Sequence, residues 1–128
     1  MNKGVYCLLL YLGKEQTIKI GIKEATFPKG YYCYVGSALN NLQKRIERHK
    51  RHNKKFHWHI DYFLKKAKIL DVKTIKTEKK KECWLSDRIK SLKSQTIMKK
   101  FGSTDCSCET HLHYFKKDPA RKISEILK

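Results

Sequence analysis

The chain has 128 residues, the length of one domain, which is enough to bury roughly two-thirds of the surface that the unfolded chain exposes. Its 30 Lys and Arg outnumber 12 Asp and Glu, and the formal net charge of +18 is spread over the whole sequence. No run approaches membrane-spanning length, there is no secretory signal, and the cysteine count of five is odd. These features argue against a membrane protein and a secreted disulfide scaffold, so we expect a cytoplasmic protein without a membrane partner.

A polyanion is the natural partner for so much positive charge, and nucleic acid is the most common one. The alternative is a lysine-rich surface that serves solubility or stability at high temperature. No Gly-, Pro- or Ser-rich linker and no internal repeat divides the chain. We therefore expect a single domain over residues 1–128, with a core at about 3–116 and a C-terminal helix at about 118–127.

Three strands are expected in the first part of the chain. Residues 4–12 are apolar almost throughout and predict a strand buried on both faces, whereas residues 17–22 alternate as a half-exposed strand does. Residues 25–30 contain the Pro and Gly of a turn, and residues 31–36 form the third strand, which Gly36 closes. Because the three strands are close in sequence, we expect an antiparallel meander.

The period becomes helical from Asn40 onward, where Leu42 and Ile46 are apolar and Ser37 or Asn40 can cap the helix. Helices and strands then alternate. We expect a helix at 56–67, a strand at 68–77, a helix at 80–92, a loop and short strand at 101–115, and a terminal helix with Pro119 in its first turn. This order predicts an α+β domain, with a small antiparallel or mixed sheet flanked by helices.

Two basic residues of the first helix lie where solvated charges are not expected. Arg45 follows Leu42 by one helical turn and His49 follows Arg45 by another, so both border the apolar stripe. Such a pair can bind an anion in a cleft. Alternatively, Arg45 extends along the edge of the core and His49 is satisfied by a backbone carbonyl. Neighbouring basic residues, among them Arg48, are expected to point into solvent.

Glu82 raises the same question with the opposite charge. It lies on the inward face of the helix at 80–92, near the positive N-terminal end. A carboxylate is seldom buried unless it is paired or bound to a metal, so Glu82 is either a metal ligand or the partner of a lysine or of the helix dipole. Tyr6 and Tyr34 belong to strands that we expect to be neighbours, and they can be core or catalytic residues. Gly36 allows the backbone to approach a ligand.

Together, two tyrosines, an arginine, a histidine and a carboxylate suit phosphodiester hydrolysis. A carboxylate can hold a divalent ion that polarises the phosphate, a cation stabilises the charge of the transition state, and a phenol or an imidazole moves protons. The sequence contains no P-loop, nucleophile elbow or paired-carboxylate motif that would favour another chemistry.

The ordered series Gly4-Val5-Tyr6, Tyr34-Val35-Gly36, Arg45, His49 and Glu82 resembles the motif set of the GIY-YIG endonucleases. More closely, GYYCYVGSA, RIERH, HWHIDYFL, EC and FGSTDCSCETHLHYF resemble a branch of that superfamily called domain of unknown function 123, over residues 3 to about 116. Members of this branch occur in archaea and bacteria, sometimes fused to an endonuclease III-like glycosylase. The resemblance implies a GIY-YIG fold, a DNA substrate in preference to RNA and, through the fusions, a DNA-repair protein as partner.

The resemblance also implies a role for each matching residue. Glu82 would hold one Mg²⁺ or Mn²⁺, and Arg45 would contact the scissile phosphate. Tyr6 would act as general base or orient the water, with Tyr34 and His49 assisting by hydrogen bonds or proton transfer. A phenol with a pKa of about 10 is a poor base at neutral pH, so Tyr6 needs a metal ion or an arginine nearby to lower its pKa.

The sequence departs from the family pattern in two places. Tyr6 and Tyr34 lie 28 positions apart, whereas the two tyrosine motifs lie much closer together in typical members. We therefore expect residues 13–30 to insert an additional strand and turn that could reshape or cover the cleft. Many members carry an asparagine after the metal-binding glutamate, whereas no asparagine follows Asn53 here. Both departures bear on cleavage more than on the fold.

Histidines and cysteines are concentrated in the branch-specific segments. His57 or His59 can extend the phosphate site or be hydrogen-bonded within the core. A zinc site is conceivable in the later segment, but structural zinc usually has two to four residues between its cysteines, and here the gap is a single residue, so we expect no structural zinc. The side chains of this segment that could bind zinc are those of Cys106, Cys108, His111 and His113.

We favour a loop that closes over the edge of the active site in place of a zinc site. The residues that could bind substrate or support the catalytic groups are Gly36, Ser37, His57, His59, Ser103, Asp105 and His111. The other cysteines, Cys7, Cys33 and Cys83, are expected to be small core residues.

Three functions follow from these patterns. The first is a metal-dependent, endonuclease-like phosphodiester hydrolase that acts on DNA, in repair or recombination. The second is a nucleic-acid-binding module that has the same fold without cleavage, and the third is an interaction domain that serves a repair enzyme. No base-reading helix motif is present, so we expect no strong sequence specificity.

Overall fold

The computed structural model describes residues 3–38, 40–51, 54–104 and 106–127. In chain order its elements are Gly4–Leu12 (β1), Gln16–Ile20 (β2), Lys23–Phe27 (β3), Gly30–Ala38 (β4), Leu42–Lys50 (α1), His59–Leu64 (α2), Lys68–Lys76 (β5), Glu82–Lys90 (α3), Gln95–Thr96 (β6), Leu112–Phe115 (β7) and Ala120–Ile126 (α4). The predicted α+β class is confirmed. Within this described part, every helix is too short or too polar to cross a membrane.

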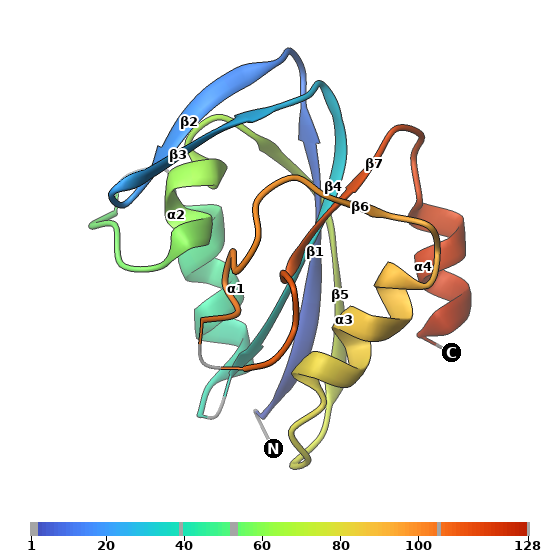
Figure 1. Ribbon diagram of the computed structural model, residues 1–128. Coiled ribbons are helices and arrows are strands. Elements are labelled where there is room, and N and C mark those ends of the chain that lie inside the picture. Colours follow the sequence, from blue (N-terminus) through green and yellow to red (C-terminus); the bar gives the residue numbers. More distant parts are fainter. Residues whose placement is uncertain (1–2, 39, 52–53, 105, 128) are drawn as a thin grey trace.

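Five strands form one antiparallel sheet in the order β5-β1-β4-β7-β6 (Figure 1). β1 and β4 pair along their full length, so Tyr6 and Tyr34 lie on neighbouring strands as predicted. β1 is an inner strand that is buried on both faces, which is what its nearly continuous apolar sequence predicts.

Helices cover both faces of this sheet. Figure 1 shows α1 and α2 on one side and α3 and α4 on the other. Alternate residues of β1 divide between two apolar clusters. Tyr6 and Leu8 belong to the cluster that packs against α1, α2 and the β2–β3 hairpin, while Cys7 and Leu9 belong to the cluster that packs against α3 and α4.

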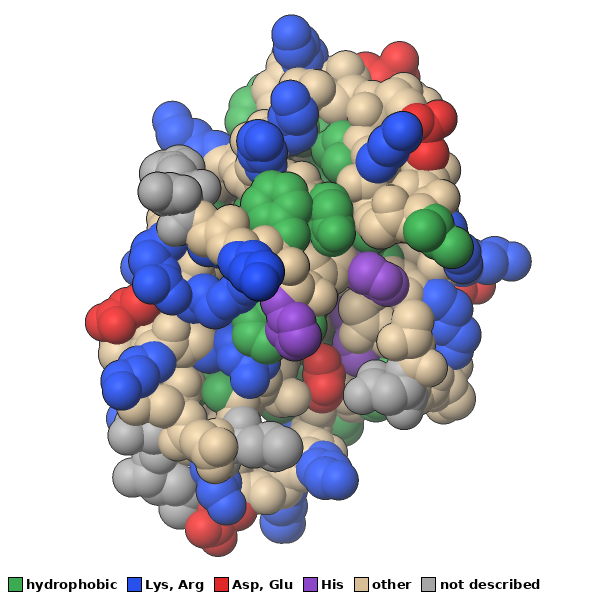
Figure 2. Space-filling model, turned by 90° about the vertical axis from the view of Figure 1, so that its left-hand side faces the viewer, with side chains coloured by type: hydrophobic (Ala, Val, Ile, Leu, Met, Phe, Trp, Pro, Cys, Tyr) green, Lys and Arg blue, Asp and Glu red, His purple; other side chains and the backbone are tan. Residues whose placement is uncertain are grey.

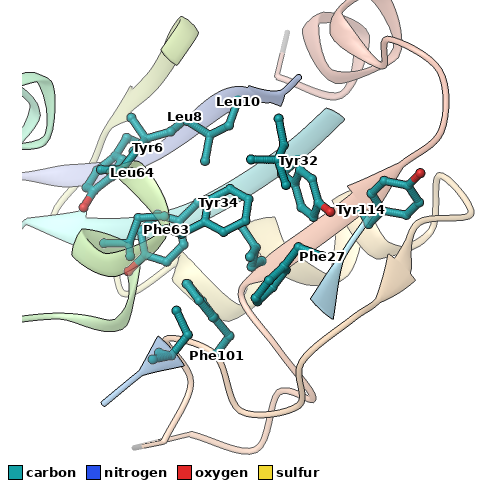
Figure 3. Close-up of a cluster of buried hydrophobic side chains, with 14 of the residues drawn as sticks. Tyr6, Leu8, Leu10, Phe27, Tyr32, Tyr34, Phe63, Leu64, Phe101 and Tyr114 are labelled. Carbon is teal, nitrogen blue, oxygen red and sulfur yellow. The ribbon is translucent and has the colours of Figure 1, made fainter. Parts of the chain in front are cut away.

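Aromatic residues fill the cluster on the α1 and α2 side (Figure 3). Phe27, the last residue of β3, is fully buried, and its ring centroid lies 5.1 Å from that of Phe63 and 6.5 Å from that of Phe101. Tyr32 of β4 lies 4.8 Å from Phe63 in the same edge-on manner. Such edge-to-face contacts stabilise aromatic pairs beyond the effect of burial. The segment between the two tyrosine motifs is therefore part of the core.

The predicted three-stranded meander is wrong. β1 pairs directly with β4, and residues 17–22 contribute to a separate hairpin in which β2 pairs with β3. The chain reverses at Gly21, whose φ of 64° favours glycine, and not within residues 25–30. The sequence did not predict β3, because only Ala25 and Phe27 of this strand face inward and its other residues are charged or polar.

The start of α1 also differs from the prediction. The N-cap is Asn41, whose side chain accepts a hydrogen bond from the backbone N–H of Lys44 at 3.0 Å. The cap is therefore neither Ser37 nor Asn40. Ser37 instead remains in β4, where its side chain is available to the site described below.

The remaining boundaries are close to the predicted ones, with three differences. α2 is shorter than residues 56–67 and begins only after Trp58. Pro119 is the N-cap of α4 and does not lie in its first turn. The two-residue strand β6 was not predicted, because so short a strand exists only through its pairing with β7.

Candidate functional site

A cleft of about 370 Å³ is lined by residues from β1, β4, α1, the N-terminal ends of α2 and α3, and the β6–β7 loop. Figure 2 shows this side of the molecule, where histidines lie beside an acidic group in the middle and Lys and Arg gather along one side. The lining residues that the sequence predicts for the site are Tyr6, Tyr34, Gly36, Ser37, Arg45, His57, His59 and Glu82. The others are Trp58, Gly102 and Thr104.

Tyr6 reaches the cleft across Gly36, which lies directly opposite it on β4. A Cβ atom at Gly36 would overlap the phenol ring of Tyr6. Glycine is therefore needed here because the tyrosine ring, and not a ligand, occupies the space above the backbone. Tyr34 lies on the same face of β4 as Gly36, and its ring packs 6.2 Å from that of Phe101.

The Tyr6 hydroxyl forms a buried hydrogen bond with Nε2 of His49 at 2.7 Å. His49 is buried behind Tyr6 and does not itself line the cleft, and its side-chain partner is this phenol and not a backbone carbonyl. Burial, with Lys54 nearby, lowers the pKa of His49 to about 4. Burial also raises the pKa of Tyr6 and of Tyr34, and the opposing effect of Arg45 does not overcome it. All three groups are therefore uncharged at neutral pH.

Arg45 is held at the wall of the cleft by two contacts. Its Nη1 donates a hydrogen bond to the carbonyl oxygen of Ser37 at 2.9 Å, and its guanidinium carbon lies 4.4 Å from the ring centroid of Trp58. Arg48 lies at the same distance from that ring. Cations over an indole ring are attracted by its electron-rich face. Trp58 thus fixes two positive charges beside the cleft.

Asp61 positions both Trp58 and Arg48. Its fully buried carboxylate accepts two hydrogen bonds from Arg48, at 2.9 and 3.0 Å, and one each from the backbone N–H groups of His57 and Trp58, at 2.8 and 2.9 Å. Burial acts to raise the pKa of Asp61, but these hydrogen bonds outweigh it and the pKa is lowered. The prediction that Arg48 simply points into solvent is wrong.

Glu82 is the first residue of α3 and the one acidic side chain among the described residues that line the cleft. Its Oε2 accepts a hydrogen bond from Ser37 Oγ at 3.1 Å, and its Oε1 lies 3.3 Å from His111 Nδ1. The side chain is 32% exposed, so a ligand can reach it. Carboxylate oxygens are the ligands that Mg²⁺ and Mn²⁺ prefer. The donor set of the cleft therefore fits one such ion.

Both His57 and His59 line the cleft, where the sequence leaves open a role for either one. Nδ1 of His59 accepts a hydrogen bond from the backbone N–H of Gly102 at 3.1 Å, which ties α2 to the β6–β7 loop. Burial lowers the pKa of His59, so this nitrogen stays unprotonated at neutral pH. His57 is exposed.

The β6–β7 loop, residues 97–111, forms one edge of the cleft, in keeping with the predicted position. Gly102 and Thr104 are the loop residues that line it. Ser103 is fully buried and does not line the cleft, while His111 is buried behind Glu82. Asp105, also predicted for the site, lies outside the described residues.

The cysteines expected in the core behave in two ways. Cys7 and Cys33 are buried as predicted, but a disulfide joins them between β1 and β4. Cys83 is only partly buried and is not a core residue. Its sulfur belongs to a group of ligand atoms that all lie within 4.8 Å of one another, from Cys83, Cys106, Cys108 and His111.

His113, which the sequence groups with these cysteines, lies elsewhere. It is buried on β7, its Nε2 is 2.7 Å from Ser86 Oγ, and its Nδ1 is 3.3 Å from Ser94 Oγ. Burial, with His111 nearby, lowers the pKa of His113 to about 4. These contacts give His113 a structural role that connects α3 with β7.

A basic rim borders the cleft on the side of Trp58. It is a hollow of about 510 Å³ that shares His57 with the cleft. Lys54 in the rim donates hydrogen bonds to the carbonyl oxygens of Arg48 and His49, which lie in the last turn of α1. The rim suits a chain of phosphate groups that continues out of the cleft. Its residues are Arg48, Arg51, Lys54, Lys55, Phe56 and His57.

The contributions of Trp58, Arg48 and Asp61 were missed from the sequence. Asp61 follows Trp58 by three positions, the spacing at which an acidic side chain returns to the first N–H groups of a helix. This signal in the segment HWHID could have identified Asp61 as a structural acid. No sequence signal indicates Thr104.

The model of a protein family described as domain of unknown function DUF123 matches residues 5–128. The match runs from β1 through α4 and includes every residue that lines the cleft. No curated protein matches the chain significantly, and no solved structure does so.

Proposed function

We propose that this chain, which belongs to the DUF123 family, is a metal-dependent phosphodiester hydrolase that acts as an endonuclease on DNA, in repair or recombination. One observation carries the proposal: Tyr6 from β1, Arg45 from α1 and Glu82 from α3 line a single cleft. The same residues, with Tyr34 and His49, make up the GIY-YIG motif that the sequence resembles.

Arg45 binds the scissile phosphate. A planar guanidinium group matches the geometry of phosphate oxygens and keeps its charge at any physiological pH. Because Ser37 and Trp58 already orient Arg45, little side-chain entropy is lost when the phosphate binds. The fixed charge then stabilises the additional negative charge of the transition state.

Glu82 would hold a divalent ion, with Ser37 orienting one carboxylate oxygen. When bound there, Mg²⁺ or Mn²⁺ would polarise the phosphate and make a water molecule more acidic. The N-terminus of α3, where Glu82 lies, favours a negative charge, so the carboxylate is stabilised in the form that binds a cation.

Without a metal ion Tyr6 keeps its proton, so we assign it the role of a hydrogen-bond donor that orients groups in the cleft and not that of a general base. Proton transfer from its hydroxyl to His49 is strongly unfavourable, because burial raises the pKa of Tyr6 and lowers that of His49 to about 4. Nδ1 of His49 has no hydrogen-bond partner among the described residues, so a proton there would be a buried, unpaired donor. The imidazole proton therefore belongs on Nε2 and is donated to the Tyr6 oxygen. The Tyr6 O–H is then left to orient a phosphate oxygen or a water molecule in the cleft.

The basic rim binds the DNA backbone beside the cleft. A net charge of +18 attracts any polyanion, and the rim provides a local track of cations next to the reacting phosphate. Phosphate contacts position a nucleic acid without reading its sequence. Substrate choice would then depend on DNA shape, such as a flap or a branch.

A specific observation favours a second candidate, a nucleic-acid-binding module without cleavage. Tyr6 and Tyr34 keep their protons at neutral pH, and His49 is a weak base with a pKa of about 4 that is buried behind Tyr6, so none of them is suited to take a proton from water before a metal ion binds. Such a protein would bind DNA through Arg45 and the rim and leave it intact.

A cleavage assay on labelled linear, flapped and branched DNA with Mg²⁺ or Mn²⁺ tests the proposal, with an RNA duplex in parallel. We expect metal-dependent cutting that Glu82→Gln and Arg45→Ala each reduce by at least about 100-fold under single-turnover conditions. Glu47→Gln and Lys122→Ala are matched controls, because they remove the same charges from exposed positions on α1 and α4.

The result that overturns the nuclease proposal is intact DNA with every metal ion while salt-sensitive binding persists. Binding by Glu82→Gln that equals that of the wild type, with no effect of metal, would then identify the binding module.

A further inference from the structure

We infer that this protein holds a structural zinc ion between α3 and the β6–β7 loop, bound by Cys83, Cys106, Cys108 and His111. The ligand atoms of these four side chains all lie within 4.8 Å of one another. Three sulfurs and one imidazole nitrogen form a donor set that selects zinc over magnesium or calcium. This site is separate from the divalent-ion site at Glu82 and does not depend on the proposed nuclease function.

The spacing of the ligand atoms fits a tetrahedral ion. With Zn–S bonds of about 2.3 Å and Zn–N bonds of about 2.0 Å, neighbouring ligand atoms are about 3.6–3.8 Å apart. Cys106 Sγ lies 3.6 Å from His111 Nε2, which is the length of one such edge. Shifts of about 1 Å in the side chains would bring the widest pair to the same distance.

The single residue between Cys106 and Cys108, which argues against zinc in the sequence, is compensated by the third thiol. Cys83 comes from the first turn of α3, so it approaches from outside the loop. Cys106 and Cys108 lie in a segment without regular structure, where the backbone can curve around an ion. Four protein ligands leave no open position, which is the pattern of a structural and not a catalytic zinc site.

The second nitrogen of His111 explains how the ion acts on its surroundings. Nδ1 of His111 lies 3.3 Å from Glu82 Oε1 but does not form a well-aligned hydrogen bond with any described residue. Zinc on Nε2 would require the imidazole proton to sit on Nδ1 and would turn the ring towards the carboxylate. A histidine ligand that donates to a carboxylate in this way is a recurring arrangement at zinc sites. The ion would therefore fix the loop to α3 and orient Glu82.

The full chain, purified with a non-chelating reductant and passed through metal-free buffer, provides the test. We expect roughly one zinc per chain by elemental analysis. Replacement of zinc by Co²⁺ should give intense visible bands of a tetrahedral complex and a sulfur-to-cobalt charge-transfer band in the near ultraviolet. These measurements on the wild type do not require that any variant folds.

Variants then identify the ligands. Each of the three serine variants, Cys83→Ser, Cys106→Ser and Cys108→Ser, should lose most of the zinc. His111→Ala should also lower the affinity for metal but should keep the sulfur-to-cobalt charge-transfer band, because the three thiolates remain. Ser107→Ala is the matched control, because this exposed residue lies between two ligands and offers none itself.

Two results would overturn the zinc site. One is a wild-type protein with fully reduced thiols that retains no zinc and gives only the weak spectrum of octahedral Co²⁺. The other is a zinc content that stays the same in Cys106→Ser and Cys108→Ser as in the wild type, which would place the ion elsewhere.

Discussion

The hydroxyl of Tyr6 lies 2.7 Å from Nε2 of His49, although 43 positions separate the two residues in the sequence. The bond joins the inner strand β1 to α1, the helix that also carries Arg45. Tyr6 is 1% and His49 is 2% exposed, so water competes little for either group. The same contact therefore contributes to the stability of the fold and to the geometry of the cleft.

Tyr6→Phe should destabilise the protein and impair DNA cleavage. Without the hydroxyl, Nε2 of His49 is left buried and unpaired, which costs about 1–3 kcal/mol in the free energy of unfolding. Urea denaturation of the variant measures this cost. Tyr11→Phe is the matched control, because Tyr11 is a partly exposed tyrosine on the same strand. Equal unfolding midpoints for the two variants would contradict the importance of the Tyr6–His49 bond.

Stability should fall as the pH is lowered from 7 towards 4. The pKa of His49 is about 4 in the folded protein and about 6.5 in the unfolded chain, so the unfolded chain binds more protons in this range. Lowering the pH to about 4.5 should cost on the order of 2 kcal/mol through His49, and His113 adds a loss of the same sign. Urea denaturation at both pH values measures the loss.

His49→Gln should show a smaller loss of stability between these pH values than the wild type, since it removes one of the two histidines whose pKa is lowered to about 4 in the folded protein. His57→Gln removes an exposed histidine and should keep the wild-type dependence. The assignment fails if the two variants respond to pH in the same way.

Gly36→Ala should displace Tyr6 from the cleft. The added methyl group would overlap the phenol ring, so either the ring or the β1–β4 pairing must move, at a cost of about 1–3 kcal/mol. Gly13→Ala is a suitable comparison, because its nearest side-chain atom lies 3.8 Å from the added carbon. Thermal unfolding and a single-turnover cleavage assay measure both effects, and normal cleavage by Gly36→Ala would contradict them.

Sequence periodicity identifies residues whose chemistry conflicts with their position. Arg45 and Glu82 stand out because a charge on an inward helical face needs a reason, and both line the cleft. The same periodicity cannot tell which distant segment meets each of them. The partners Ser37 and Trp58 come from β4 and from the start of α2, and only the folded chain brings them to Arg45.

The failures of prediction have related causes. β3 is missed because its outward residues are charged and polar and its pairing with β2 creates the strand. Arg48 is expected in solvent because helical spacing says nothing of Asp61, which reaches it from α2. Cys83 is expected in the core because the two cysteines that lie beside it in the fold, Cys106 and Cys108, are far from it in the sequence.

Asp61→Asn should be strongly destabilising. The fully buried carboxylate accepts four hydrogen bonds, two of them from Arg48, and removal of one charge leaves the other unpaired, which costs about 3–5 kcal/mol. Asp71→Asn breaks the exposed pair with Lys73 and should cost less than about 1 kcal/mol. Chemical denaturation of both variants makes the comparison, and costs of similar size would show that Asp61 does not organise the wall of the cleft.

Arg51→Ala and Lys55→Ala should weaken DNA binding and its dependence on salt. Both residues are exposed in the basic rim, and a variant that no longer neutralises one phosphate should have a slope of log affinity against log salt that is smaller by about one. Lys122→Ala on α4 removes the same charge on the opposite side of the sheet and should leave the slope nearly unchanged. Fluorescence anisotropy over a range of salt concentrations measures the slopes. If all three variants changed the slope equally, the attraction would arise from the net charge of the molecule and not from the cations of the rim.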